Sequence, residues 1–176
     1  EKLGFAFRHD LGYLTACPSN LGTGLRASVM LHLPALELSE QVEPIVRAAQ
    51  QLGFTLRGPL GEGSDIRGGF AQDSNQSTLG EDEQTILNRL ELIVDRLVQA
   101  ERKTRQTLLR ESPSILRDRI GRAVGILRYA EQLALEEAQV LLGELRLGVL
   151  TELVTGIDLA DVDQLLVQTG PGHLAY

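Results

Sequence analysis

The chain of 176 residues is long enough for one ordinary domain with a sizeable core, and its 43% hydrophobic and 23% charged residues are typical of folded proteins. A net charge of -7 argues against non-specific binding to nucleic acid or to an anionic membrane. Aromatic residues make up only 4%, without Trp, which argues against base-stacking platforms for single-stranded nucleic acid.

Three short apolar stretches between turn-forming residues predict β-strands, at residues 11–17, 29–33 and 54–56. Residues 39–52 carry apolar side chains at helical spacing and predict a helix, with Ser39 as its N-cap and Gly53 just after its end. Residues 57–80 contain six glycines, a density that predicts a loop.

Residues 81–110 predict a long amphipathic helix with acidic residues in its first turn, where the helix dipole favours them. Its apolar face consists of Ile86, Leu90, Ile93, Val94, Leu97 and Val98. Pro113 breaks this pattern, and the remainder predicts three shorter helices, at residues 114–130, 134–145 and 159–167. Strands and helices therefore mix before residue 111 and only helices follow, which predicts two domains, residues 1–110 and a small helical one at 111–176.

The single cysteine, Cys17, cannot form an intramolecular disulfide, which favours a reducing cytoplasm and excludes a cysteine-cluster metal site. No apolar run approaches the roughly 20 residues that cross a bilayer, and the first residues do not resemble a signal peptide. Because the chain begins without Met, we expect a fragment or a processed product.

Residues 17–26 place Cys17, two glycines and Arg26 directly after a predicted strand. A cysteine near an arginine and loop amides is suited to form a thiolate that orients a cationic substrate. A small buried hydrophobic side chain at a strand end explains the same cysteine equally well. The residues alone leave both interpretations open.

Residues 57–64, Arg-Gly-Pro-Leu-Gly-Glu-Gly-Ser, combine glycines that free the backbone to wrap a phosphate with a planar bidentate donor, Arg57. Glu62 adds the carboxylate that a cationic phosphate acceptor needs, since phosphoryl transfer depends on positioning and charge neutralisation. Without a Walker pattern, an ordinary surface turn with an Arg–Glu pair is the more frequent explanation of such a segment.

Together these segments resemble the phosphagen kinase superfamily, whose catalytic domain carries Gly-(Tyr/Phe)-Leu-Thr-x-Cys-Pro-(Ser/Thr)-Asn-Leu-Gly-Thr-x-(Leu/Val)-Arg. Residues 12–26 match this pattern throughout. The order continues with Arg57-Gly58, Gly61-Glu62, Ser74-Asn75 and Leu79-Gly80. The resemblance implies an α+β fold with an antiparallel sheet flanked by helices, followed by the helical segment.

Within the superfamily, residues 16–34 and 60–64 look most like the bacterial protein arginine kinases. These enzymes continue past the long helix with a helical segment similar to residues 125–127 and 145–148, whereas kinases of small guanidines end soon after that helix. The resemblance covers almost the whole chain and implies that the N-terminal half of the family, with further phosphate-binding arginines, is missing.

The resemblance implies two groups of site residues and Mg-ATP as phosphoryl donor, the metal bridging phosphates rather than sitting in a protein cage. Cys17 and Glu62 would be catalytic, Cys17 as a thiolate on the substrate side and Glu62 as a ligand of the substrate guanidinium. The nucleotide-binding residues would be Arg26, Ala27, Ser28, Val29, Met30, Arg57, Gly58, Pro59, Leu60, Gly61 and Glu62.

The family's regulatory phosphoarginine site, an Arg-Asp-x-x-Arg-Ala segment, is expected beyond Tyr176. Residues 117–123 look similar, but their spacing is one residue too long, so a basic solvated helix face is the preferred interpretation. His32 and His173 are expected to be structural or exposed, because their spacing does not suggest a metal site.

The leading hypothesis is an ATP-dependent kinase that phosphorylates arginine side chains in proteins and marks them for regulated degradation in bacteria. Its expected partners are arginine-bearing proteins, an activator protein, a Clp-type protease machine and a second copy of the chain. The alternatives are a phosphagen kinase acting on a small guanidine and an inactive binding or dimerisation module. We expect the fragment by itself to be inactive.

Overall fold

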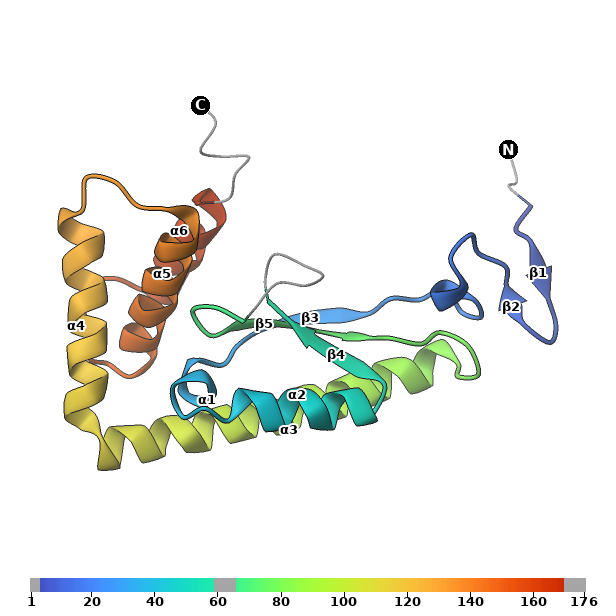
Figure 1. Cartoon of the computed structure of the whole chain (residues 1–176), viewed down its shortest axis with the longest axis horizontal. Coiled ribbons are helices and arrows are strands. Elements are labelled where there is room, and N and C mark those ends of the chain that lie inside the picture. Colours follow the sequence, from blue (N-terminus) through green and yellow to red (C-terminus); the bar gives the residue numbers. More distant parts are fainter. Residues whose placement is uncertain (1–3, 59–65, 170–176) are drawn as a thin grey trace.

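The computed structural model describes residues 4–58 and 66–169. It holds a three-stranded antiparallel sheet in the order β3–β5–β4 and a separate two-stranded hairpin, β1–β2. Two helices, α2 and α3, lie along one face of the larger sheet, and α4, α5 and α6 stand at one end of it (Figure 1). The α+β class and the antiparallel sheet are as predicted.

The elements are bounded as follows. The strands are β1 (Phe7–Arg8), β2 (Gly12–Tyr13), β3 (Ser28–His32), β4 (Phe54–Arg57) and β5 (Phe70–Asn75). The helices are α1 (Pro34–Leu38), α2 (Val42–Gln51), α3 (Glu83–Glu111), α4 (Pro113–Tyr129), α5 (Leu135–Leu150) and α6 (Leu159–Gln168). No helix within the described ranges is both long enough and apolar enough to cross a membrane.

The main core lies between the sheet and α3. Leu31, Phe54 and Leu56 point from the strands toward Leu90 and Ile93 of the helix, and all five are buried. Successive side chains of a strand alternate between its faces, so the residues between these apolar ones face the other way. The sheet therefore has one apolar face against α3 and one face directed away from it.

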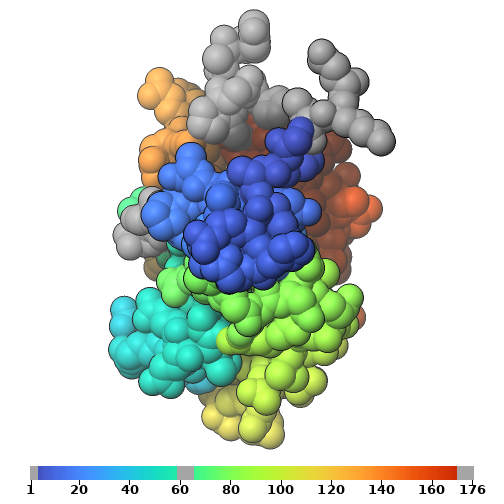
Figure 2. All heavy atoms as spheres, turned by 90° about the vertical axis from the view of Figure 1, so that its right-hand side faces the viewer, coloured from blue at the N-terminus to red at the C-terminus, as the bar shows by residue number. Residues whose placement is uncertain are grey.

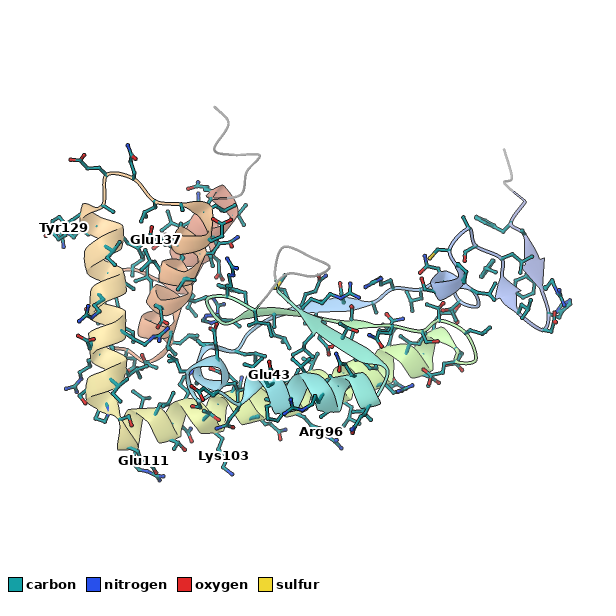
Figure 3. The ribbon with its side chains drawn as sticks, viewed as in Figure 1. Glu43, Arg96, Lys103, Glu111, Tyr129 and Glu137 are labelled. Atoms are coloured by element: carbon teal, nitrogen blue, oxygen red, sulfur yellow. The ribbon has the colours of Figure 1, made fainter. Side chains whose placement is uncertain are left out.

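Helix α3 forms as its sequence predicts. Asp82 is its N-cap, and its carboxylate accepts a hydrogen bond from the backbone N–H of Thr85 at 2.7 Å. The predicted apolar face, which includes Ile86 and Leu97, is the buried one. Arg96 and Lys103 point from α3 away from the sheet (Figure 3).

The short helix α1 has no counterpart among the predicted elements. Pro34 starts it, and the buried carboxylate of Glu101 in α3 accepts hydrogen bonds from the backbone N–H groups of Ala35 and Leu36 at 3.0–3.2 Å. Arg105 pairs with the same carboxylate at 3.0 Å. A long-range contact therefore satisfies the N-terminus of a helix that is too short to be stable alone.

Three predicted elements differ from the structure. The strand expected at 11–17 is limited to the two residues of β2, and a 3-10 turn follows at Pro18–Asn20. The loop expected at 57–80 contains β5, the central strand of the sheet, so that prediction is wrong for residues 70–75. Ser39 follows the end of α1 and is not the N-cap of α2, which is Gln41.

Helices α4 and α6 begin and end within one residue of their predicted bounds, whereas α5 continues five residues past its predicted end, and Pro113 occupies the first turn of α4. Leu116 and Ile120 of α4 pack on Leu147 of α5, and Leu38 and Leu109 contribute to the same cluster. The proposed division near residue 111 therefore crosses a packed contact, because Leu38 and Leu109 belong to the preceding elements.

The hairpin β1–β2 projects from the end of the molecule opposite α4, and its dark blue atoms face the viewer in Figure 2. Phe5 and Phe7 there are 75% and 51% exposed, and Tyr13 packs edge-on against both rings. These aromatic side chains contact one another and remain accessible.

Candidate functional site

The sheet face directed away from α3 carries two rows of side chains that are all polar except Met30, and Ser74 and Thr55 among them are buried. The strand register places Ser28, Ser74 and Thr55 side by side in one row. It places Met30, Gln72 and Arg57 side by side in the next. Arg57 therefore lies beside β5 and in the same row as Met30, although 26 residues lie between Met30 and Arg57 in the sequence.

Strand β3 divides the predicted nucleotide-binding residues 26–30 between the two faces. Ala27 and Val29 pack against the main core, whereas Arg26, Ser28 and Met30 are exposed. A ligand on the open face would therefore meet the side chains of the last three and only the backbone of the first two.

Arg26 and Arg57 occupy different parts of this face. Arg26 precedes Met30 by four residues, which corresponds to about 13 Å along a strand, and β5 separates β3 from β4. This separation would let the two arginines reach different parts of one extended anionic ligand.

Asn75 holds the backbone on both sides of Arg26. Its side-chain oxygen accepts from the N–H of Ala27 at 2.9 Å, and its amide nitrogen donates to the carbonyl of Leu25 at 2.9 Å and to that of Ser77 at 3.1 Å. Asn75 is only 4% exposed. This buried amide positions the segment that carries Arg26, a role that its place in a predicted loop did not reveal.

Cys17 lies in the loop before β3, in the 3-10 turn region away from the larger sheet (Figure 1). It is exposed, so the interpretation as a small buried hydrophobic side chain is wrong. Its Sγ atom lies 2.9 Å from the Ser19 hydroxyl. The Thr78 hydroxyl donates to the carbonyls of Ser19 at 3.1 Å and Leu21 at 2.7 Å, which anchors this loop to the segment after β5.

The second predicted segment is only partly described. Arg57 ends β4, and Gly58 follows it as a buried residue. Pro59, Leu60, Gly61 and Glu62 lie outside the described residues. The structure therefore places Arg57 and the 26–30 segment on one sheet, with Cys17 in the loop that leads into β3.

A groove of about 780 Å³ adjoins Arg57 at the β4 edge of the sheet. Its charged lining residues are Glu37, Glu40, Glu43, Arg47 and Arg57. Burial raises the pKa of Glu37 above its ordinary value, and the nearby backbone N–H of Gly69 offsets part of this increase. Arg57 is thus accessible from the strand edge as well as from the open face.

Asp73 is the one fully buried carboxylate side chain among the described residues, and it lies in β5 on the side of the sheet that faces α3. Burial raises its pKa from 3.8 to about 6, and the backbone N–H of Ser74 offsets part of the increase. The predicted loop concealed this residue as well, because only the strand register shows that Asp73 faces inward.

Asp73→Asn is expected to stabilise the protein at neutral pH but not near pH 4. Between pH 3.8 and about 6 the folded protein keeps a proton that the unfolded chain has lost, so the free energy of unfolding falls as pH rises. Above pH 6, the buried Asp73 carboxylate lowers the free energy of unfolding by about 3 kcal/mol. Urea unfolding of the wild type and of Asp73→Asn at pH 4 and pH 7 measures this change. A stability difference between the two that does not depend on pH would contradict the raised pKa of Asp73.

The other candidate groups have structural roles. In the described part of the chain, no group of three or more His, Cys, Asp or Glu residues is arranged to hold a metal ion.

The basic segment at residues 117–123 makes ion pairs of two kinds. Arg122 pairs with Asp118 on the exposed face of α4, as a solvated basic face predicts, but Arg119 pairs with the buried Glu144 of α5. His32 is packed between elements, and His173 lies outside the described residues.

Two known families match consecutive parts of the chain. Residues 1–104 match the family described as ATP:guanido phosphotransferase, C-terminal catalytic domain. Residues 113–176 match the family described as protein-arginine kinase McsB C-terminal domain.

Relatives include the protein-arginine kinases of Moorella thermoacetica, 46% identical over 100% of this chain and 50% of that protein, and of Bacillus subtilis, 41% identical over 99% and 48%. The chain thus spans about half the length of the curated relatives it matches. Among solved structures, the duplicated taurocyamine kinase from Schistosoma mansoni with bound transition state analog components is 32% identical over 56% of this chain and 14% of that one, with a TM-score of 0.49. Since the first family match covers more than half of its residues, the chain belongs to the ATP:guanido phosphotransferase family.

Proposed function

We propose that the complete protein to which this chain belongs is a protein arginine kinase, which transfers the terminal phosphoryl group of ATP to arginine side chains of other proteins. The observation that carries this proposal is that Arg57 shares a row with Met30 on the sheet face where Ser28 and Met30 are exposed, with Arg26 just before β3. The helical tail at residues 113–176 and the names of the relatives favour a protein substrate over a small guanidine.

The proposed donor is Mg-ATP. Arg26 lies just before β3 and Arg57 ends β4, and the exposed Ser28 and Met30 lie on the same face, which suits a phosphate chain and the negative charge that builds up during transfer. Mg²⁺ is usually held largely by the phosphates of its nucleotide, so it needs few protein ligands here. It would supply charge neutralisation between the phosphates when bound.

We assign Ser28 and Met30 to side-chain contacts with the nucleotide, and Ala27 and Val29 to backbone contacts. Gly58, Pro59, Leu60 and Gly61 are proposed to complete the binding segment that starts at Arg57. These assignments follow from the motif and from the faces on which residues 26–30 lie.

Glu62 is proposed to bind the guanidinium of the arginine that is phosphorylated, through paired charge-assisted hydrogen bonds. Cys17 is proposed to face the same guanidinium as a thiolate, with the neighbouring Ser19 hydroxyl 2.9 Å away as a hydrogen-bond partner. Neither group needs to form a covalent intermediate, because the phosphoryl group moves directly between its two bound partners.

The proposed setting is the bacterial cytoplasm, where the lone exposed Cys17 would stay reduced. Phosphorylated proteins would pass to a Clp-type protease machine, and an activator protein and a second copy of the chain are proposed as further partners. Residues 1–110 and 111–176 are proposed as the two domains of this part of the protein.

The test is phosphoarginine formation by the complete natural protein and by residues 1–176 alone, with Mg-ATP and three acceptors in parallel. The acceptors are an arginine-rich protein, free arginine and creatine. We expect labelling of the protein acceptor, and only by the complete form. Labelling of free guanidines alone would make it a phosphagen kinase, and nucleotide binding without any labelling would make it a binding module.

A further inference from the structure

The start of β5 is a tight glycine turn. Arg67 and Phe70 pair across it, and Gly68 and Gly69 between them have φ angles of 61° and 77°. Positive φ at both central residues is the type I′ geometry, which glycine adopts without steric cost. Both glycines are buried, so other elements must cover the turn.

Helix α5 covers one side of this turn by direct backbone contact. A Cβ atom on Gly143 of α5 would overlap the Gly68 carbonyl oxygen and would lie 2.8 Å from the Gly68 carbonyl carbon. A Cβ on Gly68 would in turn lie 2.7 Å from the carbonyl oxygen of Gln139. The two glycines therefore permit an approach between helix and turn that any other residue would prevent.

The segment before α1 covers the other side. The backbone N–H of Leu33 donates to the Gly69 carbonyl at 2.6 Å, and a Cβ on Gly69 would lie 2.7 Å from the backbone nitrogen of Pro34. The turn is therefore held between α5 and the start of α1, which Glu101 of α3 in turn anchors.

A side-chain bridge joins α5 to β3 beside the turn. Arg146 lies 3.2 Å from Nδ1 of His32, and it pairs with Asp163 of α6 at 2.7 Å. The His32 ring packs against Phe70 with 4.6 Å between centroids. Burial and the neighbouring Arg146 and Arg105 lower the pKa of His32 to about 3, so the ring is neutral and its Nδ1 accepts the hydrogen bond from Arg146.

We propose that α5 is a positioning element of the nucleotide site. Gly143 seats the Gly68–Gly69 turn, and Gln72 lies only three residues after this turn, beside Arg57 in the strand register. A displaced turn would shift the start of β5 and with it the row that carries Arg57. The ligand in this inference rests on the proposed function, whereas the coupling of α5 to β5 does not.

The variant that tests the coupling is Gly143→Ala in the complete natural protein. Its methyl group would meet backbone, which cannot move aside cheaply. We expect about tenfold weaker binding of Mg-ADP and a lower kcat on protein substrate, since small displacements of positioned groups have large effects on transfer. We also expect faster hydrogen–deuterium exchange at the amides of residues 70–75.

Two glycine-to-alanine controls separate this contact from general damage to the helices. Gly148→Ala changes the same helix, but the atoms nearest to its methyl group belong to the side chains of Ile120 and Val154 and not to backbone. Gly121→Ala on α4 would meet nothing within 4 Å. Neither is expected to change nucleotide affinity or exchange in β5, whatever its effect on thermal stability.

Arg146→Met removes the side-chain bridge from α5 to His32 without adding volume between α5 and the glycine turn. It therefore tests the coupling of α5 to β5 even if Gly143→Ala does not fold. We expect it to act in the same direction, with Arg146→Lys restoring part of the affinity. Wild-type affinity and exchange in every folded variant would overturn the proposal, as would equal losses in Gly148→Ala. If the wild type itself binds no Mg-ADP, the proposed function fails, and the exchange measurement alone still tests the coupling.

Discussion

Arg57→Ala in the complete natural protein is expected to lower the rate of phosphoryl transfer by about two to three orders of magnitude. Arg57 lies at the end of β4 on the sheet face directed away from α3, where its guanidinium would stabilise the negative charge of the transferred group. Arg57 is half-buried and outside the main core, so the fold should survive its removal. Initial rates of phosphoarginine formation at saturating Mg-ATP, with circular dichroism as the check of folding, measure the effect.

Arg96→Ala is the matched control, because Arg96 is exposed on the side of α3 that points away from the sheet (Figure 3). It removes the same charge and a similar side-chain volume without touching the candidate site. Equal activity of the two variants would refute the assignment of Arg57. A rise in KM for ATP at unchanged kcat would restrict Arg57 to binding the ground state of the nucleotide.

Glu101→Ala is expected to destabilise the protein by about 3 kcal/mol. Glu101 is 2% exposed, and its carboxylate accepts hydrogen bonds from the N–H groups of Ala35 and Leu36 and pairs with Arg105. Its loss would leave the start of α1 without acceptors and Arg105 without its buried partner. Urea denaturation at pH 7, followed by circular dichroism, gives the change in the free energy of unfolding.

Glu91→Ala supplies the comparison for this experiment, since Glu91 is exposed on the same helix. A surface glutamate of α3 should contribute only a few tenths of a kcal/mol. If both variants lost the same stability, the anchoring of α1 by Glu101 would have no measurable value. A large loss specific to Glu101 would establish that α1 depends on α3 for its formation.

The helices illustrate what local patterns predict well. Helix α3 has an apolar stripe, an acidic N-cap and a following proline, and its observed bounds differ from the predicted ones by two residues at most. Its signals are all local, because periodicity, capping and chain breaking act within a few residues. The Cys17–Arg26 motif was likewise visible, since the motif is a property of consecutive residues.

Strand β5 illustrates where local patterns fail. Its sequence, Phe-Ala-Gln-Asp-Ser-Asn, has only two apolar residues and lies between glycines, so its composition indicates a loop. It is nevertheless the central strand, because β3 and β4 supply hydrogen-bond partners on both of its edges. The same strand pairing sets the faces on which Gln72, Asp73 and Asn75 lie, and the neighbouring residues in the sequence do not predict those faces.

The family resemblance, the mixed class of the first 110 residues, the helical character of the rest and the identity of the arginines proposed to bind phosphate all follow from residues that are close in the chain. The outward direction of some of residues 26–30 and the shared row of Arg57 and Met30 follow from the strand pairing. Only the tertiary structure revealed that α5 touches the Gly68–Gly69 turn. The reason is physical: motifs and periodicity arise from residues close in the chain, whereas strand register and backbone contact between distant elements depend on how the whole chain packs.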